Sequence, residues 1–381
     1  MIMKLRNEKM KLCITFVHHK PIIITILVRS QKAVEDIFDS VLTSASSKLE
    51  PTTPSNEDEY DCSNRYRGLA IIICNENFKT ERLRRFYCDN EIELMKNTFG
   101  KHLNFTVLIF KDLTAEKIKW VIQTACKQPG FYRMSDCFAC VLASHGGELE
   151  VYSNDKTQSV LLREHCIYGV DNVPVSTKGI IDDLNNVNAL KDKPKLFFIQ
   201  ASRLRMDDAT IPDEEHGHTI PIHRTADEFD KMSYSECPSE NKPSLNAYQK
   251  NVSKKDTTEA SIFHKIGQLF GLNKNEDTIS ILDQSCTDDT LVVYSSASEK
   301  ISYGNTILGG WMLVSLKKAV EKQLCQTNRR YRIDFMDVLN AITSNNAVNF
   351  EARNLNPKYQ PLKTTVVYEH CFYKELNFYI N

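Results

Sequence analysis

Short runs of consecutive apolar residues recur along the chain and predict strands that are buried on both faces. Elsewhere, apolar residues recur every three or four positions, which is the spacing of a helix with one buried face. The predicted strands span 68–75, 105–111, 137–143, 196–199, 291–294 and 364–368. The predicted helices span 30–42, 89–99, 114–125, 176–184, 311–324 and 335–342. Because strands and helices alternate, the pattern indicates an α/β fold with a mostly parallel sheet and helices on both faces.

Two polar stretches interrupt this pattern and predict connecting segments. Residues 46–64 combine acidic side chains with Pro, Ser, Thr and Asn, and residues 204–287 are largely polar and charged. So little apolar periodicity favours a flexible connector over a core. His216 and His218 lie in the second stretch, and we expect them to be solvated rather than bound to a metal ion.

Composition narrows the classes of partner. The 48 Lys and Arg residues nearly balance the 49 Asp and Glu residues, so net charge gives no reason to expect nucleic acid or an anionic membrane as a partner. The apolar run at 22–28 is too short to span a bilayer and is not typical of a secretion signal. A hydrophobic content of 41% is enough for one large domain or two.

The 12 cysteines are irregularly spaced, and several lie inside predicted strands, such as Cys74, Cys137 and Cys140. A reduced cysteine behaves there as a small hydrophobic residue, so we expect a reducing compartment and assign the protein to the cytoplasm. Cys137 and Cys140 have a spacing found in zinc sites, but no second pair of ligands accompanies them. We therefore predict neither a metal ion nor a cofactor.

Two predicted strands end in residues that suggest a reactive site. The strand at 137–143 leads into Ser144-His145-Gly146, and the strand at 196–199 leads into Gln200-Ala201-Ser202. In an open α/β sheet, ligands bind at the carboxyl ends of neighbouring strands. We therefore expect His145 and Ser202 to face each other.

These residues carry a resemblance to the caspases. Gln200-Ala201-Ser202-Arg203-Leu204 is similar to the caspase pentapeptide Q-A-C-[RQG]-G, and His145 stands where the catalytic histidine is expected. The resemblance extends from about Tyr66 to the C-terminus and is nearest to nematode cell-death caspases. It implies a three-layer sandwich around a six-stranded, mostly parallel sheet.

The resemblance also implies a division of the chain into four regions. A short prodomain-like segment and linker would span 1–65, a large-subunit region 66–206, an inter-subunit linker 207–287 and a small-subunit region 288–381. In caspases that linker is cut after an aspartate, and the candidates are Asp208, Asp213, Asp230, Asp256 and Asp289. The helix after Ser30 is a prodomain remnant, a docking helix or a helix packed on the main domain.

The chain departs from the caspase pattern at the nucleophile, because Ser202 replaces the cysteine. His145, Gly146 and the amide of Ser202 would keep the proton-transfer and oxyanion framework of the family. An alcohol is far less acidic than a thiol and needs a base that is held in place by a third group. No motif in the sequence supplies that group.

The specificity pocket departs from the family as well. Caspases hold a substrate aspartate with two arginines and a glutamine, and the resemblance assigns the first arginine to Arg85 and the glutamine to Gln200. Tyr303 replaces a tryptophan of the family, and Gly304 replaces the second arginine. Tyr87 stands where the family has glycine. A lost hydrogen bond to a charged group costs about 1.5–3 kcal/mol.

The sequence therefore predicts a catalytically inactive caspase homologue. It would regulate apoptosis by binding an active caspase or its zymogen as a homo- or heterodimer through the face at the C-terminal strand, with inhibition as the favoured effect. Two alternatives stay open: a weak Asp-directed endopeptidase, and an interaction protein outside apoptosis that reuses the fold. An engineered origin of Ser202 is disfavoured, because Tyr87, Leu204 and Gly304 differ from the family too.

Overall fold

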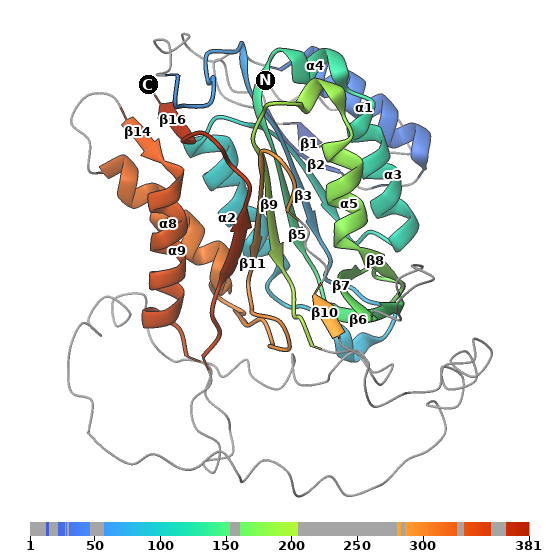
Figure 1. Ribbon diagram of the computed structural model, residues 1–381. Helices are drawn as coiled ribbons and strands as arrows, with labels where there is room; N and C mark the ends of the chain where they lie inside the picture. The colour runs from blue at the N-terminus through green and yellow to red at the C-terminus, as the bar shows by residue number, and fades with distance from the viewer. Residues whose placement is uncertain are drawn as a thin grey trace, which may run out of the picture.

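An eight-stranded sheet lies at the centre of the computed structural model, in the order β1-β2-β4-β3-β5-β9-β11-β15 (Figure 1). The structure describes residues 13–14, 22–26, 28, 30–45, 57–152, 161–204, 280–282, 286–325, 331–351 and 363–380. Neighbouring strands are parallel from β2 to β11, and only the edge strands β1 and β15 of this sheet are antiparallel to their neighbours. The strands are β1 (Cys13–Ile14), β2 (Ile23–Ile26), β3 (Tyr66–Cys74), β4 (Thr106–Lys111), β5 (Ser135–Ala143), β9 (Lys195–Gln200), β11 (Thr290–Tyr294) and β15 (Val367–His370).

Helices cover both faces of the sheet, which confirms the predicted three-layer α/β architecture (Figure 1). One face packs against α1 (Gln31–Thr43), α3 (Ala115–Cys126), α4 (Pro129–Arg133) and α5 (Thr177–Asn185). The other packs against α2 (Cys88–Met95), α8 (Trp311–Cys325) and α9 (Phe335–Asn349). Apolar residues that share a helix face produce this packing. Ser30, Thr114 and Ser176 cap their helices, because each side chain accepts a backbone N–H at the start of the helix.

The N-terminal segment extends the sheet beyond the six strands that were expected. β2 pairs in parallel with β4, and β1 pairs with β2. Helix α1 then packs against α3 and buries its apolar stripe, in which Phe38 stacks on Phe110 with ring centroids 6.2 Å apart. Of the three interpretations of this helix, packing on the main domain describes its place in the structure.

A smaller sheet follows the end of β5, and the sequence did not predict it. It contains β6 (Gly146–Tyr152), β7 (Leu161–Tyr168), β8 (Pro174–Ser176) and β10 (Ser280–Leu282). β10 lies within the predicted linker 207–287 and pairs in parallel with β7. His216, His218 and the aspartates 208, 213, 230 and 256 lie outside the described residues. Asp289 is buried and accepts a hydrogen bond from the Tyr60 hydroxyl at 2.7 Å.

The remaining elements are short. They are the hairpin of β12 (Gly304–Asn305) and β13 (Gly309–Gly310), the pair β14 (Tyr331–Asp334) and β16 (Asn377–Ile380), the 3₁₀-helices η1 (Glu81–Leu83) and η3 (Asn188–Leu190), and the π-helix η2 (Lys96–His102). The predicted helix at 89–99 is thus divided between α2 and η2. Among the described residues, no helix is both long and apolar enough to cross a membrane.

Candidate active site

The ends of β5 and β9 lie side by side and bring the two predicted corners together. Ala143 is in register with Gln200, and the Ser144 N–H donates to the Gln200 carbonyl oxygen at 3.2 Å. A Cβ atom at Gly146 would lie 2.8 Å from Ala201 Cβ and 2.9 Å from the Ser202 carbonyl oxygen. Only glycine therefore fits at this point without a shift of the neighbouring backbone.

His145 is buried, and its ring is held from the segment between β3 and α2. Its Nε2 lies 2.7 Å from the Leu83 carbonyl oxygen, and the ring packs against Phe78 with centroids 4.6 Å apart. A carbonyl oxygen only accepts, so Nε2 carries the hydrogen and donates it. Nδ1 is then the nitrogen that accepts in the neutral ring.

Ser202 is also buried, and its hydroxyl oxygen accepts a hydrogen bond from the Ser302 N–H at 2.9 Å. Its carbonyl oxygen lies 3.1 Å from His165 Nε2. Burial, together with the charge of Arg203, lowers the pKa of His165 to about 3, so this ring is neutral and Nε2 donates to the carbonyl. His165 thus holds the main chain at Ser202.

Arg203, the residue after Ser202, forms a buried ion pair. Its Nε donates to Glu148 Oε1 at 2.8 Å, and the Ser298 hydroxyl donates to Glu148 Oε2 at 2.6 Å. The Arg203 guanidinium also lies 4.2 Å from the centroid of the Tyr294 ring. Sequence reasoning missed Glu148 and His165, because both lie on strands without a continuous apolar run.

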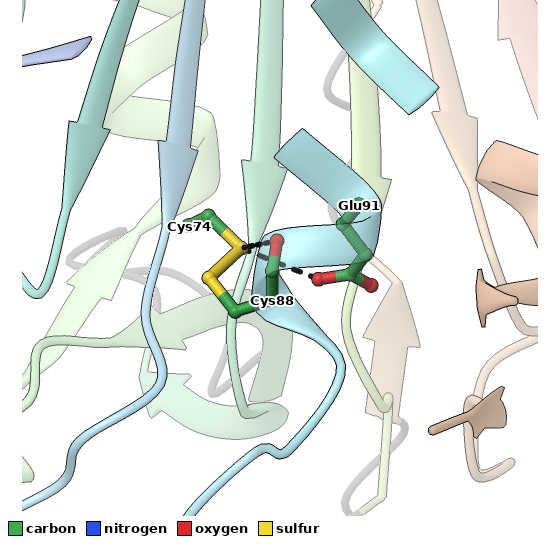
Figure 2. A group of neighbouring side chains, drawn as sticks. All are labelled: Cys74, Cys88 and Glu91. Carbon is green, nitrogen blue, oxygen red and sulfur yellow. Dashed lines mark hydrogen bonds between the residues drawn. A yellow bond between two sulfur atoms is a disulfide. The ribbon is translucent and has the colours of Figure 1, made fainter. Parts of the chain in front are cut away.

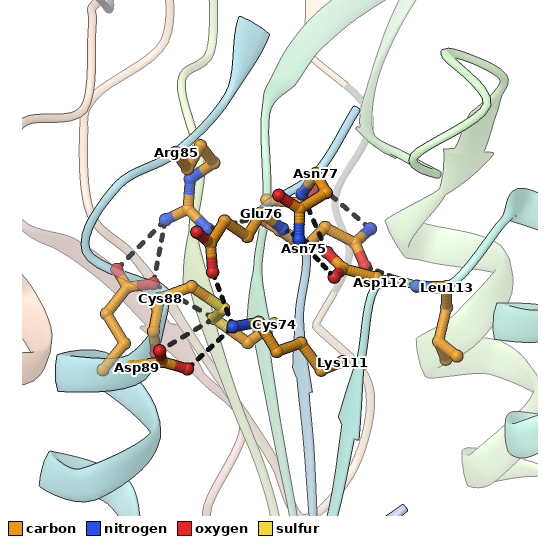
Figure 3. The surroundings of a disulfide bond; sticks show 12 residues. Cys74, Asn75, Glu76, Asn77, Arg85, Cys88, Asp89, Lys111, Asp112 and Leu113 are labelled. Atoms are coloured by element: carbon orange, nitrogen blue, oxygen red, sulfur yellow. Dashed lines mark hydrogen bonds and ion pairs between the residues drawn. A yellow bond between two sulfur atoms is a disulfide. The ribbon is translucent and has the colours of Figure 1, made fainter. Parts of the chain in front are cut away.

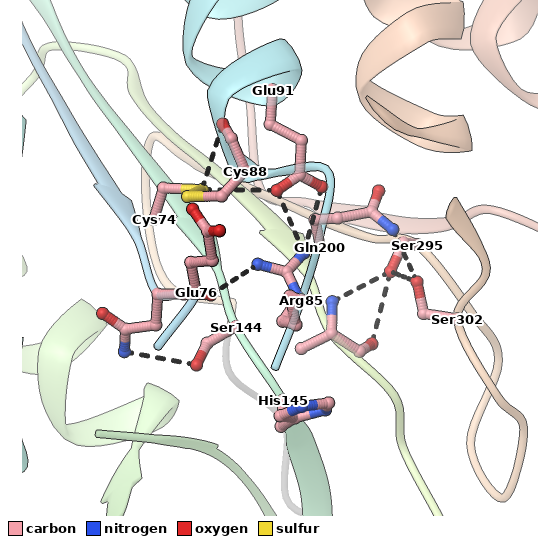
Figure 4. A network of polar contacts seen from close by, with 12 residues as sticks. Cys74, Glu76, Arg85, Cys88, Glu91, Ser144, His145, Gln200, Ser295 and Ser302 are labelled. Carbon is pink, nitrogen blue, oxygen red and sulfur yellow. Dashed lines mark hydrogen bonds and ion pairs between the residues drawn. A yellow bond between two sulfur atoms is a disulfide. The ribbon is translucent and has the colours of Figure 1, made fainter. Parts of the chain in front are cut away.

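Arg85 and Gln200 lie near one another, on the side of the sheet that faces α2 (Figure 4). Arg85 Nη2 donates to both carboxylate oxygens of Glu91 at 3.0 Å, and Nη1 donates to the Asn75 carbonyl oxygen at 3.0 Å. Both partners of the ion pair are buried. Burial raises the pKa of Glu91, and Arg85 opposes that shift. Arg85 is therefore already paired with a carboxylate of its own chain.

Gln200 contacts the segment that contains Tyr303 and Gly304. Its Nε2 donates to the Ser302 hydroxyl at 2.7 Å and to the Tyr303 carbonyl oxygen at 3.3 Å. Its Oε1 is buried and has no hydrogen-bond partner among the described residues. The Tyr303 ring packs against Trp311 with centroids 5.2 Å apart.

Tyr87 and Gly304, two of the departures from the caspase pattern, contact each other. A Cβ atom at Gly304 would lie 2.7 Å from both Cε2 and Cζ of the Tyr87 ring. The Arg85 guanidinium lies 4.8 Å from the centroid of the same ring. The tyrosine ring therefore occupies the space into which any side chain at position 304 would extend.

A disulfide joins Cys74, the last residue of β3, to Cys88, the first residue of α2 (Figure 2). The interpretation of Cys74 as a reduced core residue was wrong, because Cys74 is bonded to Cys88. The spacing of the cysteines in the sequence gave no sign that these two lie side by side. Ligand atoms of Cys74, Cys88 and Glu91 lie within 4.8 Å of one another. The two sulfur atoms are bonded to each other, so neither is a thiolate that could bind a metal ion.

Comparisons with known proteins agree with this arrangement. The caspase domain family model matches residues 67–365. The chain is 28% identical to caspase-8 of Mus musculus over 211 residues, covering 49% of this chain and 40% of that protein. It is 28% identical to caspase drICE of Drosophila melanogaster over 265 residues, covering 62% and 67%. It is 30% identical to caspase-9 of Homo sapiens over 213 residues, covering 51% and 48%. The chain thus spans less than half the length of the two vertebrate relatives.

Proposed function

The chain belongs to the caspase family, and we propose that it is a catalytically inactive member that regulates cell death by binding a caspase or caspase zymogen. The observation that carries this proposal is the filled pocket. Arg85 is paired with Glu91, and the Tyr87 ring occupies the space beside Gly304. A substrate aspartate would have to displace Glu91 from Arg85 and would find no second arginine at position 304.

The nucleophile position supports the same proposal. The Ser202 hydroxyl oxygen accepts a main-chain N–H from Ser302, and the Nε2 of His145 donates to the Leu83 carbonyl. A serine nucleophile needs a base that accepts its proton and an acid that orients the base. The group that His145 Nε2 contacts is the Leu83 carbonyl oxygen, which is an uncharged acceptor and not an acid.

The edge strand β15 is the proposed binding surface. It pairs with β11 on one side, and within the described sheet no strand pairs with its other side. Its four residues are half-buried or exposed. An open strand edge offers N–H and C=O groups to the strand of a second molecule. A caspase or a second copy of this chain would add its own terminal strand there, and inhibition would follow if this pairing replaced a productive dimer.

A second candidate function is an Asp-directed endopeptidase. The observation in its favour is that the corners after β5 and β9, which carry His145, Gly146 and Ser202, lie next to each other. Turnover of a fluorogenic aspartyl peptide tests the two functions against each other, with wild type, Ser202→Cys and His145→Ala. We expect no turnover by any of them. Turnover by wild type that His145→Ala abolishes would establish the protease, and turnover by Ser202→Cys alone would show that the pocket still accepts aspartate.

Binding needs its own measurement, because absence of turnover does not identify a partner. We would mix the full chain with the purified zymogen of drICE and measure association by analytical ultracentrifugation. His370→Pro removes one N–H from β15 and should weaken association at least tenfold, whereas the exposed Tyr373→Ala, beyond the strand, should not. Equal association of both variants would contradict the proposed surface. Self-association with no zymogen bound would favour a homodimer.

A further inference from the structure

We propose that Cys74 and Cys88 are a reversible thiol–disulfide modification site, closed by a peroxide and opened by a thiol reductant, that controls the order of the segment 75–87. This proposal is independent of whether the protein is a protease. It rests on the place of the disulfide, on the contacts of the segment that it closes, and on the groups around the two sulfur atoms (Figure 3).

The disulfide closes a segment that contacts both halves of the candidate site. Leu83 and Phe78 contact the His145 ring. Arg85 and Tyr87, at the other end of the segment, fill the pocket. Both sulfur atoms are buried at the base of the segment, where β3 ends and α2 begins. A covalent bond at this point limits the conformations that the whole segment can adopt.

The segment has little regular structure of its own to hold it. Between Cys74 and Cys88 it forms only the three-residue helix η1, and the Phe86 side chain is 60% exposed. The backbone amides of the segment that donate hydrogen bonds include those of Asn75, Glu76, Asn77, Lys79, Leu83, Arg84 and Arg85. Opening the disulfide would leave these bonds and the side-chain contacts as the restraints, so the amides should exchange faster with solvent.

Cys88 is placed to be the sulfur that reacts with a peroxide, although both cysteines are buried and the first turn of α2 also carries Asp89 and Glu91. Cys88 is the first residue of α2, where the partial positive charge of the helix N-terminus stabilises a thiolate. That thiolate attacks hydrogen peroxide, which gives a sulfenic acid on Cys88 and releases hydroxide, and the proton that the Cys88 thiol lost converts this hydroxide to water. The Cys74 thiol then attacks the Cys88 sulfur, and hydroxide leaves from it.

Glu91 is placed to handle the proton of the second step. Its Oε2 lies 3.3 Å from Cys74 Sγ, within reach of a thiol hydrogen (Figure 2). The carboxylate accepts this proton as the sulfur–sulfur bond forms and passes it to the departing hydroxide, which leaves as water. Overall, two thiols and one hydrogen peroxide give one disulfide and two waters. A dithiol reductant reverses the change by two successive exchanges and becomes a disulfide itself.

The test uses the full chain in two redox states. The protein is reduced with dithiothreitol, freed of reductant and treated with equimolar hydrogen peroxide. Differential alkylation under denaturing conditions and peptide mass spectrometry then report on each cysteine. We expect a cross-link between Cys74 and Cys88 after peroxide. Hydrogen exchange of the amides in 76–87 should be at least tenfold faster in the reduced form and should slow again on reoxidation.

Variants separate this disulfide from other oxidation. Cys88→Ser should show fast exchange in 76–87 in both redox states, while Cys371→Ser, which removes an exposed free cysteine, should behave as wild type. The wild-type comparison alone decides the matter if Cys88→Ser does not fold. Free Cys74 and Cys88 after peroxide, or equal exchange in the two states, would overturn the proposal. Retention of Zn²⁺ by the reduced chain with resistance to peroxide would overturn it too, and would assign Cys74, Cys88 and Glu91 to a metal ion.

Discussion

The close packing of two strand ends requires glycine at position 146. Its α-carbon faces Ala201 and the carbonyl oxygens of Cys166 and Ser202, and a Cβ atom would lie within 2.9 Å of each of these groups. Two of the three contacts are backbone atoms, which cannot turn aside as a flexible side chain can. The resemblance assigned Gly146 to an oxyanion-binding turn, and that role stays a prediction.

Gly146→Ala should therefore destabilise the protein. Separating β6 from the β9 corner to admit one methyl group costs about 1–3 kcal/mol, the usual penalty of overpacking. Urea denaturation followed by circular dichroism measures the change in the free energy of unfolding. Gly130→Ala is the matched control, because a Cβ atom there meets nothing within 4 Å, and its effect should be neutral or stabilising by up to about 1 kcal/mol. Equal effects of the two substitutions would contradict the close approach.

His165 gives the stability of the protein a distinct dependence on pH. Its pKa in the folded protein is lowered to about 3 by burial and by Arg203, against 6.5 for a free side chain. Below pH 6.5 the unfolded chain binds a proton that the folded chain does not, so this residue makes the protein less stable as pH falls towards 3. The loss approaches about 1.4 kcal/mol per pH unit.

The variant His165→Gln removes this term and isolates it from the rest of the protein. Glu91 acts in the opposite direction, because its raised pKa lets the folded state bind a proton first as pH falls. The difference between wild type and variant cancels that contribution. We expect the unfolding free energy of wild type to fall more steeply than that of His165→Gln between pH 6.5 and pH 4. Parallel curves would mean that His165 is protonated in the folded state.

At the scale of elements, the N-terminal strand and helix are part of the domain core. The Phe38 side chain is fully buried and stacks on Phe110 of β4. Phe38→Ala should lower the free energy of unfolding by about 3–5 kcal/mol, since it removes a large side chain from a packed interface. Asp39→Ala, on the exposed side of the same helix, should change it by less than about 0.5 kcal/mol.

Thermal or urea unfolding checks this prediction, because it shows whether the protein unfolds in one transition or in two. If Phe38→Ala left the main transition unchanged and caused only an early partial loss of helix, α1 would be a separately folding appendage. One cooperative transition, shifted as a whole, is the outcome that the shared core requires.

The elements that the sequence predicted share one property, and so do those that it missed. Continuous apolar runs predicted β3, β4, β5, β9 and β11, because a strand covered on both faces has no polar side to interrupt its run. β6 and β7 carry Glu148, Arg163 and His165, whose partners come from distant parts of the chain. No local pattern shows that such a charge will be paired and buried.

The residue at which the C-terminal strand begins could not be predicted from the local sequence either. The sequence predicted a strand at 364–368, and β15 spans Val367–His370. The carbonyl oxygen of Thr364 accepts a hydrogen bond from Asn346 of α9, and its hydroxyl donates to the Ser295 carbonyl oxygen. A tertiary contact therefore delays the start of the strand, and β propensity alone cannot locate it.

At the scale of the whole molecule, the candidate pocket joins residues from three distant parts of the chain. Arg85, Tyr87 and Glu91 come from the segment before and within α2, Gln200 from β9 and Gly304 from β12. The resemblance identified four of these positions one by one. It could not reveal that Tyr87 fills the space next to Gly304, or that Glu91 pairs with Arg85, because both facts depend on the assembled fold.

This assembly predicts that a cysteine at position 202 will not by itself give proteolysis. Ser202→Cys should show no turnover of an aspartyl peptide, whereas the triple variant Ser202→Cys, Tyr87→Gly, Gly304→Arg should show measurable turnover. The reason is that the tyrosine ring must leave before an arginine at position 304 can enter, and that arginine then pairs with the substrate carboxylate. A fluorogenic assay measures the rate, without added thiol reductant so that the Cys74–Cys88 disulfide stays closed.

Two double variants supply the controls. Ser202→Cys with Gly304→Arg keeps the ring and should stay inactive, with a loss of about 1–3 kcal/mol in stability from overpacking. Ser202→Cys with Tyr87→Gly clears the space without adding the charge and should stay inactive without that clash. Turnover by either double variant equal to that of the triple variant would mean that Tyr87 and Gly304 do not act together. If the triple variant folds but shows no turnover, the cause would lie at Glu91. Its carboxylate would then be the group that keeps a substrate aspartate from Arg85.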